Sequence, residues 1–258
     1  MAELAAAAGL ELSAAVYETS NKLRLAEVFR NWRLRKRAVV MMGHTGTGKT
    51  NLLRSLIAKA DLIESISRYC RTQTAETCKL RIDRHPYRIL DTPGQFLHES
   101  ERYKILREVR ARPPIRVINV VAWGYHEYDI NPIKAIDSDN AVRAEFLEEH
   151  RHKELGDLRK WVPLLGDRES TKWILTAVVK PDLWWGAATQ VMEYYRSGEY
   201  AREIKSFDPN LVHVVLPYCS VTHRFYDQVL LDGSFDDAVR RETSSNFLRT
   251  IVKLGLRV

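Results

Sequence analysis

The sequence predicts an α/β protein built on a mostly parallel sheet, and three observations support this prediction. From about Ala38 onward, short apolar runs alternate with longer amphipathic stretches, which is the pattern of a parallel α/β sheet. The apolar runs are rich in Val, Ile and aromatic residues, which favour strands. Directly behind the first run stands the segment GHTGTGKT, which has the spacing of a phosphate-binding loop.

The expected elements follow from this alternation. Strands are expected at 38–42, 78–83, 87–91, 115–123, 173–179 and 212–218. Only the three residues RHP separate the second strand from the third, so one of these two is expected to run antiparallel. Apolar positions recur every three or four residues in the remaining stretches, which predicts helices at 49–60, 98–111, 140–162, 187–206 and 236–254.

A basic segment precedes the sheet. Residues 22–37 contain most of the formal net charge of +7, so the rest of the chain is nearly balanced and does not resemble a basic body that follows a nucleic-acid backbone. The apolar stripe of this segment predicts an N-terminal amphipathic helix; it consists of Leu25, Val28, Phe29 and Trp32. Three interpretations stay open for this helix: packing on the domain or contact with another protein, binding to an anionic membrane surface, or binding to nucleic acid.

Length and composition set the class of protein. A chain of 258 residues, 45% of them hydrophobic, can bury a substantial core in one large domain with attachments. No run of about 18 apolar residues occurs, so no membrane span is expected. The three cysteines form no CxxC pair, which argues against a disulfide framework and a zinc site. A cytoplasmic protein is the expectation.

The phosphate loop matches G-x-x-x-x-G-K-T between a predicted strand and a predicted helix. Glycines allow successive backbone N–H groups to turn toward phosphates, and the next helix offers its positive N-terminal end. The lysine would reach the β- and γ-phosphates, and the last threonine would bind Mg²⁺. The nucleotide-binding residues expected here are Gly43, Thr45, Gly46, Thr47, Gly48, Lys49, Thr50 and Asn51.

A second candidate for the phosphate side is the segment RILDTPGQ. Asp91 stands at the end of a predicted strand, where a carboxylate suits a Mg²⁺ role. The amide of Gly94 can approach a γ-phosphate because no side chain blocks it. The same letters also form ordinary turns, so the phosphate loop before them carries the interpretation.

A phosphate loop followed by Asp-x-x-Gly and Gln resembles the Ras-like P-loop GTPases, the small-GTPase G domains of the TRAFAC class. The resemblance implies an Asn-Lys-x-Asp segment that reads the base, and VVKPDL supplies Lys180 and Asp182. Val179 stands where the family usually has Asn, a residue that ties this segment to the phosphate loop. The carboxylate of Asp182 can accept two hydrogen bonds from guanine, and adenine offers no such pair of donors.

Further site residues are implied by the resemblance alone. Gln95 would orient the attacking water and act with Lys49 in catalysis, and Ser220-Val221 would contact the base through the backbone. A switch threonine would join Thr50 and Asp91 at Mg²⁺. Thr74 is favoured among the candidates Thr72, Thr74 and Thr77.

The resemblance implies a G domain at 38–258 with a six-stranded, mostly parallel sheet, one antiparallel strand and flanking helices, behind a basic helical extension at 1–37. It implies a protein that binds GTP and GDP, hydrolyses GTP slowly with Mg²⁺, and acts as a switch or assembly factor with a protein effector or activator. The alternative is a non-hydrolysing, GTP-dependent scaffold recruited through its basic helix. An ATPase or kinase would require Lys180 and Asp182 to be coincidental.

Two features exceed the minimal domain of this family. The surplus of chain at 124–158 contains His126, His150 and His152 beside carboxylates, which suggests either a metal site or a lengthened helix for a partner. A solvated helix face is expected for EEHRHKE, because His150 and His152 do not share one face. The tryptophans at 184 and 185 could stack on a base or pack in the core.

Overall fold

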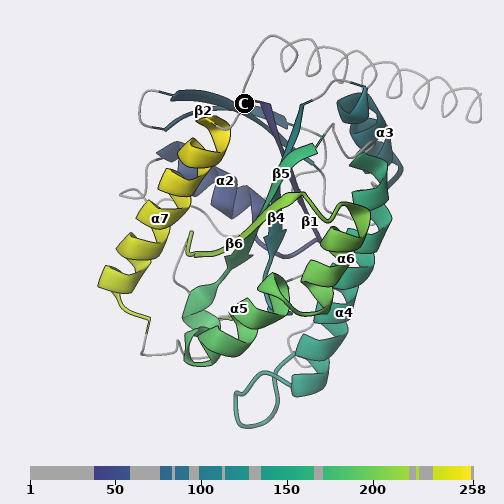
Figure 1. Cartoon of the computed structure of the whole chain (residues 1–258). Coiled ribbons are helices and arrows are strands. Elements are labelled where there is room, and N and C mark those ends of the chain that lie inside the picture. Colours follow the sequence, from purple (N-terminus) through teal and green to yellow (C-terminus); the bar gives the residue numbers. More distant parts are fainter. Residues whose placement is uncertain are drawn as a thin grey trace, which may run out of the picture.

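The computed structural model describes residues 38–58, 76–82, 85–92, 99–111, 114–127, 135–165, 171–220, 225–226 and 235–256. Its centre is a six-stranded sheet with the order β2-β3-β1-β4-β5-β6, and helices cover both faces (Figure 1). The amphipathic helix expected within residues 1–37 lies outside the described residues.

The strands agree closely with the sequence-based expectation. Their bounds are β1 Ala38–Gly43, β2 Glu76–Ile82, β3 His85–Asp91, β4 Ile115–Val121, β5 Thr171–Val179 and β6 Val212–Tyr218. β2 pairs antiparallel with β3, and every other pair of neighbours in this sheet is parallel. The expected antiparallel strand is therefore confirmed.

The helices follow the expected stretches with one exception. Their bounds are α2 Lys49–Ala58, α3 Glu99–Arg110, α4 Ala144–Trp161, α5 Ala188–Arg196, α6 Glu199–Phe207 and α7 Asp237–Leu256. The single helix expected at 187–206 is wrong, because Ser197 and Gly198 divide it into α5 and α6. Both of these backbone N–H groups donate to the carbonyl of Glu193, and Gly198 is then extended. Gly and Ser are weak helix formers, so the chain turns there.

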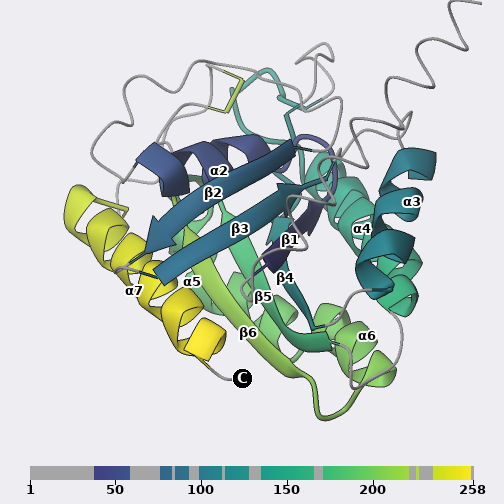
Figure 2. The ribbon, with the colours of Figure 1, turned by 90° about the horizontal axis from the view of Figure 1, so that it is seen from above.

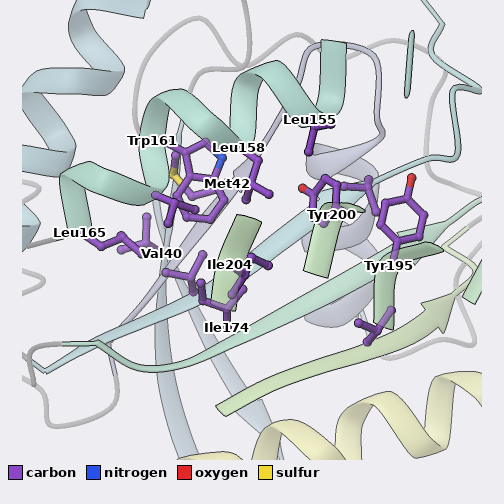
Figure 3. Close-up of a cluster of buried hydrophobic side chains, with 14 of the residues drawn as sticks. Val40, Met42, Leu155, Leu158, Trp161, Leu165, Ile174, Tyr195, Tyr200 and Ile204 are labelled. Carbon is purple, nitrogen blue, oxygen red and sulfur yellow. The ribbon is translucent and has the colours of Figure 1, made fainter. Parts of the chain in front are cut away.

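Two apolar layers hold the helices on the sheet. Successive residues of a strand point to opposite faces, so β1 directs Val39 and Met41 to one layer and Val40 and Met42 to the other. α2 and α7 cover the first face, while α3, α4, α5 and α6 cover the second (Figures 1 and 2). Figure 3 shows buried side chains of the second layer, from β1 and β5 and from the helices above them. Burial on both faces explains why the strands read as continuous apolar runs.

The parallel arrangement places the carboxyl ends of five strands at one edge of the sheet, which is where ligands bind in open α/β folds. β1 ends there at Gly43, β3 at Asp91 and β5 at Val179. Among the helices in the described ranges, none has the length and apolar character that crossing a membrane requires.

Candidate functional site

The loop between β1 and α2 is shaped by close backbone contacts at two glycines. Gly43 has a φ of 142°, and a Cβ atom there would stand 2.3 Å from the carbonyl oxygen of Val120. Gly46 has a φ of 77°, and its Cβ would stand 2.6 Å from the carbonyl oxygen of Glu127. Side chains at these positions would therefore both strain the backbone and collide with neighbouring main chain. The main chain of β4 and of the segment after it therefore packs directly against the loop and leaves no room for side chains at these two glycines.

A buried lysine lies inside this loop. Lys49 begins α2, is 6% exposed, and its Nζ donates to the carbonyls of Gly43 at 2.8 Å and His44 at 2.9 Å. Thr47 is fully buried and donates its hydroxyl to the same His44 carbonyl at 2.9 Å. The cation and the positive end of α2 thus face one concave turn of backbone, which is the electrostatic arrangement that attracts phosphate.

Two oxygen ligands of the kind that Mg²⁺ prefers belong to this region. Thr50 is the second residue of α2, and Asp91 is 1% exposed at the end of β3, where it pairs in register with Met41 of β1. Thr92 donates its hydroxyl to the carbonyl of Met41 at 2.7 Å, which fixes the chain directly after Asp91. A hydroxyl and a carboxylate fit Mg²⁺, which takes its remaining ligands from phosphates and water.

The other expected residues of the phosphate side lie partly inside and partly outside the described ranges. Thr45 and Asn51 lie half-buried in the loop and in the first turn of α2. Thr77 belongs to β2, opposite Leu90 of β3. The predictions for Thr72, Thr74, Gly94, Gln95 and Val221 concern residues outside the described ranges.

The segment expected to read the base leaves β5 through an unusual backbone conformation. Lys180 has φ 58° and ψ 44°, a left-handed conformation, and a short 3₁₀ turn Pro181–Leu183 follows. Asp182 in this turn is 1% exposed, and the Sγ of Cys219 lies 3.8 Å from its Oδ1. Ser220 follows Cys219 directly, so the two segments expected at the base come together beyond the paired ends of β5 and β6.

Of the two tryptophans after Asp182, Trp184 belongs to the buried core and Trp185 packs against it. Trp184 is 3% exposed, and its indole N–H donates to the carbonyl of Val179 at 2.9 Å. Trp185 is half-buried, and its ring centroid lies 5.2 Å from that of Phe235. The expected core role is therefore found for Trp184.

The comparison with known families agrees with this geometry. Residues 38–154 match the sequence profile of the family described as 50S ribosome-binding GTPase. The matched residues include the phosphate loop and Asp91. No curated protein matches the sequence.

One solved structure similar to this chain is a GTP-binding protein from the hyperthermophilic archaeon Sulfolobus solfataricus, in complex with GDP. The TM-score is 0.48 at 12% sequence identity, and the match covers 95% of this chain and 60% of that chain. This chain thus spans about 60% of the length of that structure.

One residue of the candidate site, Glu127, was not predicted from the sequence. Lys180 directs its Nζ to Oε2 of Glu127 at 2.6 Å and to the carbonyl of Tyr125 at 2.7 Å. The backbone N–H of Glu127 donates to the carbonyl of Gly46 in the phosphate loop at 3.2 Å. The available signal was positional: this segment follows β4, which lies between β1 and β5 in the sheet.

A buried polar network lies next to the phosphate loop. The ring of His126 stacks on that of His44, with centroids 5.3 Å apart, and its Nε2 lies 2.7 Å from Oε1 of Glu154. Glu154 also accepts the N–H of Ala122 at 2.7 Å and the hydroxyl of Tyr195 at 2.5 Å. Burial lowers the pKa of His126 well below its usual value and raises the pKa of Glu154 to about 7. Helix α4 is thereby connected to the phosphate loop.

The histidines of the surplus segment take different positions. His150 is buried, and its Nδ1 lies 2.7 Å from the carbonyl of Phe146, whereas His152 is exposed. The solvated face expected for EEHRHKE is thus interrupted by His150 and Glu154, which point inward. Within the described residues, no group of three or more His, Cys, Asp or Glu side chains could hold a metal ion.

Proposed function

We propose that the protein binds GTP with Mg²⁺ and hydrolyses it to GDP and phosphate, as a molecular switch or assembly factor. The observation that carries this proposal is the common edge of the sheet: a loop that encloses Lys49 and a buried Asp182 both lie beyond its parallel strands. A nucleotide with its phosphates in the loop and its base at Asp182 would satisfy both. The match of residues 38–154 to the family described as 50S ribosome-binding GTPase supports the same proposal.

The phosphate side assigns roles to the residues of the loop. Lys49 would move its Nζ from the carbonyls of its own loop to the β- and γ-phosphates, where it offsets negative charge. The amides of Gly43, Gly46 and Gly48 belong to the proposed cradle, together with Thr45, Thr47 and Asn51. Thr50 and Asp91 would hold Mg²⁺, which neutralises the charge that develops on the phosphates. In the absence of a finger-like arginine from a partner, hydrolysis would be slow.

Three further assignments come from the family pattern. Gln95 would orient the attacking water, the Gly94 amide would contact the γ-phosphate, and Thr74 would close over the metal. Multiple-turnover release of phosphate from purified protein, with Gln95→Ala as comparison, tests hydrolysis. Turnover no higher than the nucleotide-only background would instead support the GTP-dependent scaffold.

The proposed recognition of guanine by Asp182 predicts a specific change in nucleotide preference. Asp182 would accept hydrogen bonds from the ring N–H and the amino group of guanine, with Ser220-Val221 beside the base. Asp182→Asn exchanges one acceptor for a donor, and xanthine carries an oxygen where guanine has its amino group. We therefore expect this variant to lose about 100-fold or more in GDP affinity and to gain affinity for xanthosine diphosphate.

Displacement of a fluorescent guanine nucleotide measures both affinities. The wild type is expected to prefer GTP over ATP, because adenine would leave a buried carboxylate unpaired. Equal competition by ATP, or an unchanged base preference in Asp182→Asn, would contradict guanine recognition at this residue.

A partner is part of the proposal. The family's description names the 50S ribosome, and the basic segment 22–37 would supply a charged contact surface within the extension 1–37. Co-sedimentation with ribosomes in the presence of a non-hydrolysable GTP analogue or GDP tests this partner. Removal of residues 1–37 from otherwise intact protein would show whether that extension makes the contact, while the domain at 38–258 with its insertion at 124–158 retains nucleotide binding. We also propose a cytoplasmic location.

A further inference from the structure

The segment expected to read the base lacks the asparagine that ties it to the phosphate loop in the Ras-like GTPases that the sequence resembles. Val179 occupies that position, is 1% exposed, and packs in the apolar layer below α2 and α7. A valine side chain can donate or accept no hydrogen bond. If the phosphates and the base are to be bound together, another residue has to fix the distance between the two halves of the site.

We infer that Glu127 is this positioning residue: it holds the phosphate loop and the base-reading segment in register for one guanine nucleotide. The inference rests on the proposed guanine-nucleotide site. Glu127 follows β4, whereas the family's asparagine position, Val179, ends β5. The tie would thus be made from a different strand of the sheet.

Three contacts of Glu127 reach three separate segments. Its backbone N–H donates to the carbonyl of Gly46 at 3.2 Å, which joins it to the phosphate loop. Its Oε2 lies 2.6 Å from Nζ of Lys180, and its Oε1 accepts the backbone N–H of Tyr226 at 3.1 Å. Lys180 and Asp182 are two residues apart in the same turn, so a restraint on Lys180 also restrains Asp182.

The ion pair of Glu127 and Lys180 is shielded from solvent. The side chains of these two residues are 10% and 8% exposed, so their attraction is screened less than that of a surface pair. The absent side chain of Gly46 allows the backbone of Glu127 to approach the loop. Lys180 is held in a left-handed conformation that a residue with a side chain rarely adopts, and its Nζ is anchored by Glu127 and by the carbonyl of Tyr125.

Two possible roles of Glu127, stabilising the loop and positioning the two halves of the site, predict different effects on ligand binding. If Glu127 only stabilised the loop, its loss would weaken the binding of any ligand that the loop holds. If it sets the register between the two halves, its loss would weaken a ligand that spans both halves and leave a ligand of the phosphate half alone unchanged. GDP spans both halves of the proposed site, and inorganic pyrophosphate occupies only the loop.

The experiment compares these two ligands in the full chain. Glu127→Gln removes the charge, and Glu149→Gln is the matched control, because Glu149 pairs with Lys153 at 2.6 Å on the surface with 63% of its side chain exposed. Dissociation of a fluorescent GDP analogue is followed by stopped flow, and pyrophosphate affinity is measured by competition. Folding of each variant is checked by circular dichroism.

We expect Glu127→Gln to release the GDP analogue at least about tenfold faster, with pyrophosphate affinity within about twofold of the wild type. The Glu149→Gln control should match the wild type for both ligands. Glu127→Asp, which keeps the charge but shortens the side chain, should give intermediate release and serves if Glu127→Gln does not fold. Release as slow as in the wild type from the folded variants, or an equal loss for GDP and pyrophosphate, would overturn the inference. Absence of guanine-nucleotide binding by the wild type would instead contradict the proposed function.

Discussion

Replacement of Glu154 by Gln should change how the stability of this protein depends on pH. The carboxyl group is buried beside the end of β4, where it accepts hydrogen bonds from the N–H of Ala122 and the hydroxyl of Tyr195 and faces Nε2 of His126. Burial raises its pKa from 4.5 to about 7. At 1.36 kcal/mol per pKa unit, this difference corresponds to about 3 kcal/mol, as an upper limit.

The direction in which stability changes with pH follows from the number of protons bound by the folded and the unfolded protein. Between about pH 4.5 and pH 7 the unfolded chain has lost the proton of Glu154 while the folded protein retains it, so the free energy of unfolding falls as the pH rises. Gln does not titrate, and its amide can accept from Ala122 and donate to the oxygen of Tyr195. His126 acts in the opposite direction, because its lowered pKa makes stability rise toward pH 6.5, but it is present in both proteins.

Urea unfolding of both proteins at pH 4.5 and pH 8 measures the effect. The free energy of unfolding of Glu154→Gln, relative to the wild type, should increase between these two pH values by up to about 3 kcal/mol. Glu149→Gln, at an exposed position, should show a change below about 0.5 kcal/mol. A difference between Glu154→Gln and wild type that does not vary with pH, or that decreases as the pH rises, would refute this reasoning.

Three further substitutions test other parts of the structure. Gly156→Ala should stabilise the protein by about 0.5–1 kcal/mol in urea unfolding, because Gly156 lies inside α4 and an added Cβ meets no atom within 4 Å; a loss would show a crowded position. Gly46→Ala should lower the melting temperature and abolish binding of the fluorescent GDP analogue, since its Cβ would collide with Glu127; wild-type binding would contradict the described loop. Tyr195→Phe should cost about 1–3 kcal/mol in unfolding free energy by removing the hydroxyl between Glu154 and the N–H of Trp123; no loss would show that water replaces it.

The elements of the fold were largely predictable from the sequence, because their signals are local. Apolar runs marked all six strands of the sheet, and the three residues RHP between the expected strands 78–83 and 87–91 indicated the antiparallel pair. The break between α5 and α6 was missed, since the apolar spacing continues across Ser197 and Gly198. The weak helix propensity of Ser and Gly at these two positions was the local signal that could have indicated the break.

The candidate site divides in the same way. The phosphate loop and the segment with Asp182 are recognisable because their chemistry needs fixed spacings along the chain. Glu127 and Glu154 carry no such signature, and the surrounding segment 124–158 looked like a surplus for a partner. Only the sheet order, which puts β4 between β1 and β5, brings Glu127 to Gly46 and Lys180.

By itself, the sequence determined the class of fold, the order of its elements and the loop suited to phosphates, since periodicity and motif spacing are written along the chain. Tertiary structure decided which side chains become neighbours of that loop. His126 stacks on His44, Glu154 accepts a hydrogen bond from Ala122 at the end of β4, and Glu127 lies between Gly46 and Lys180. The physical reason is that burial and ion pairing depend on distances through space. Residues 46, 127 and 180 meet because parallel strands end at one edge of the sheet.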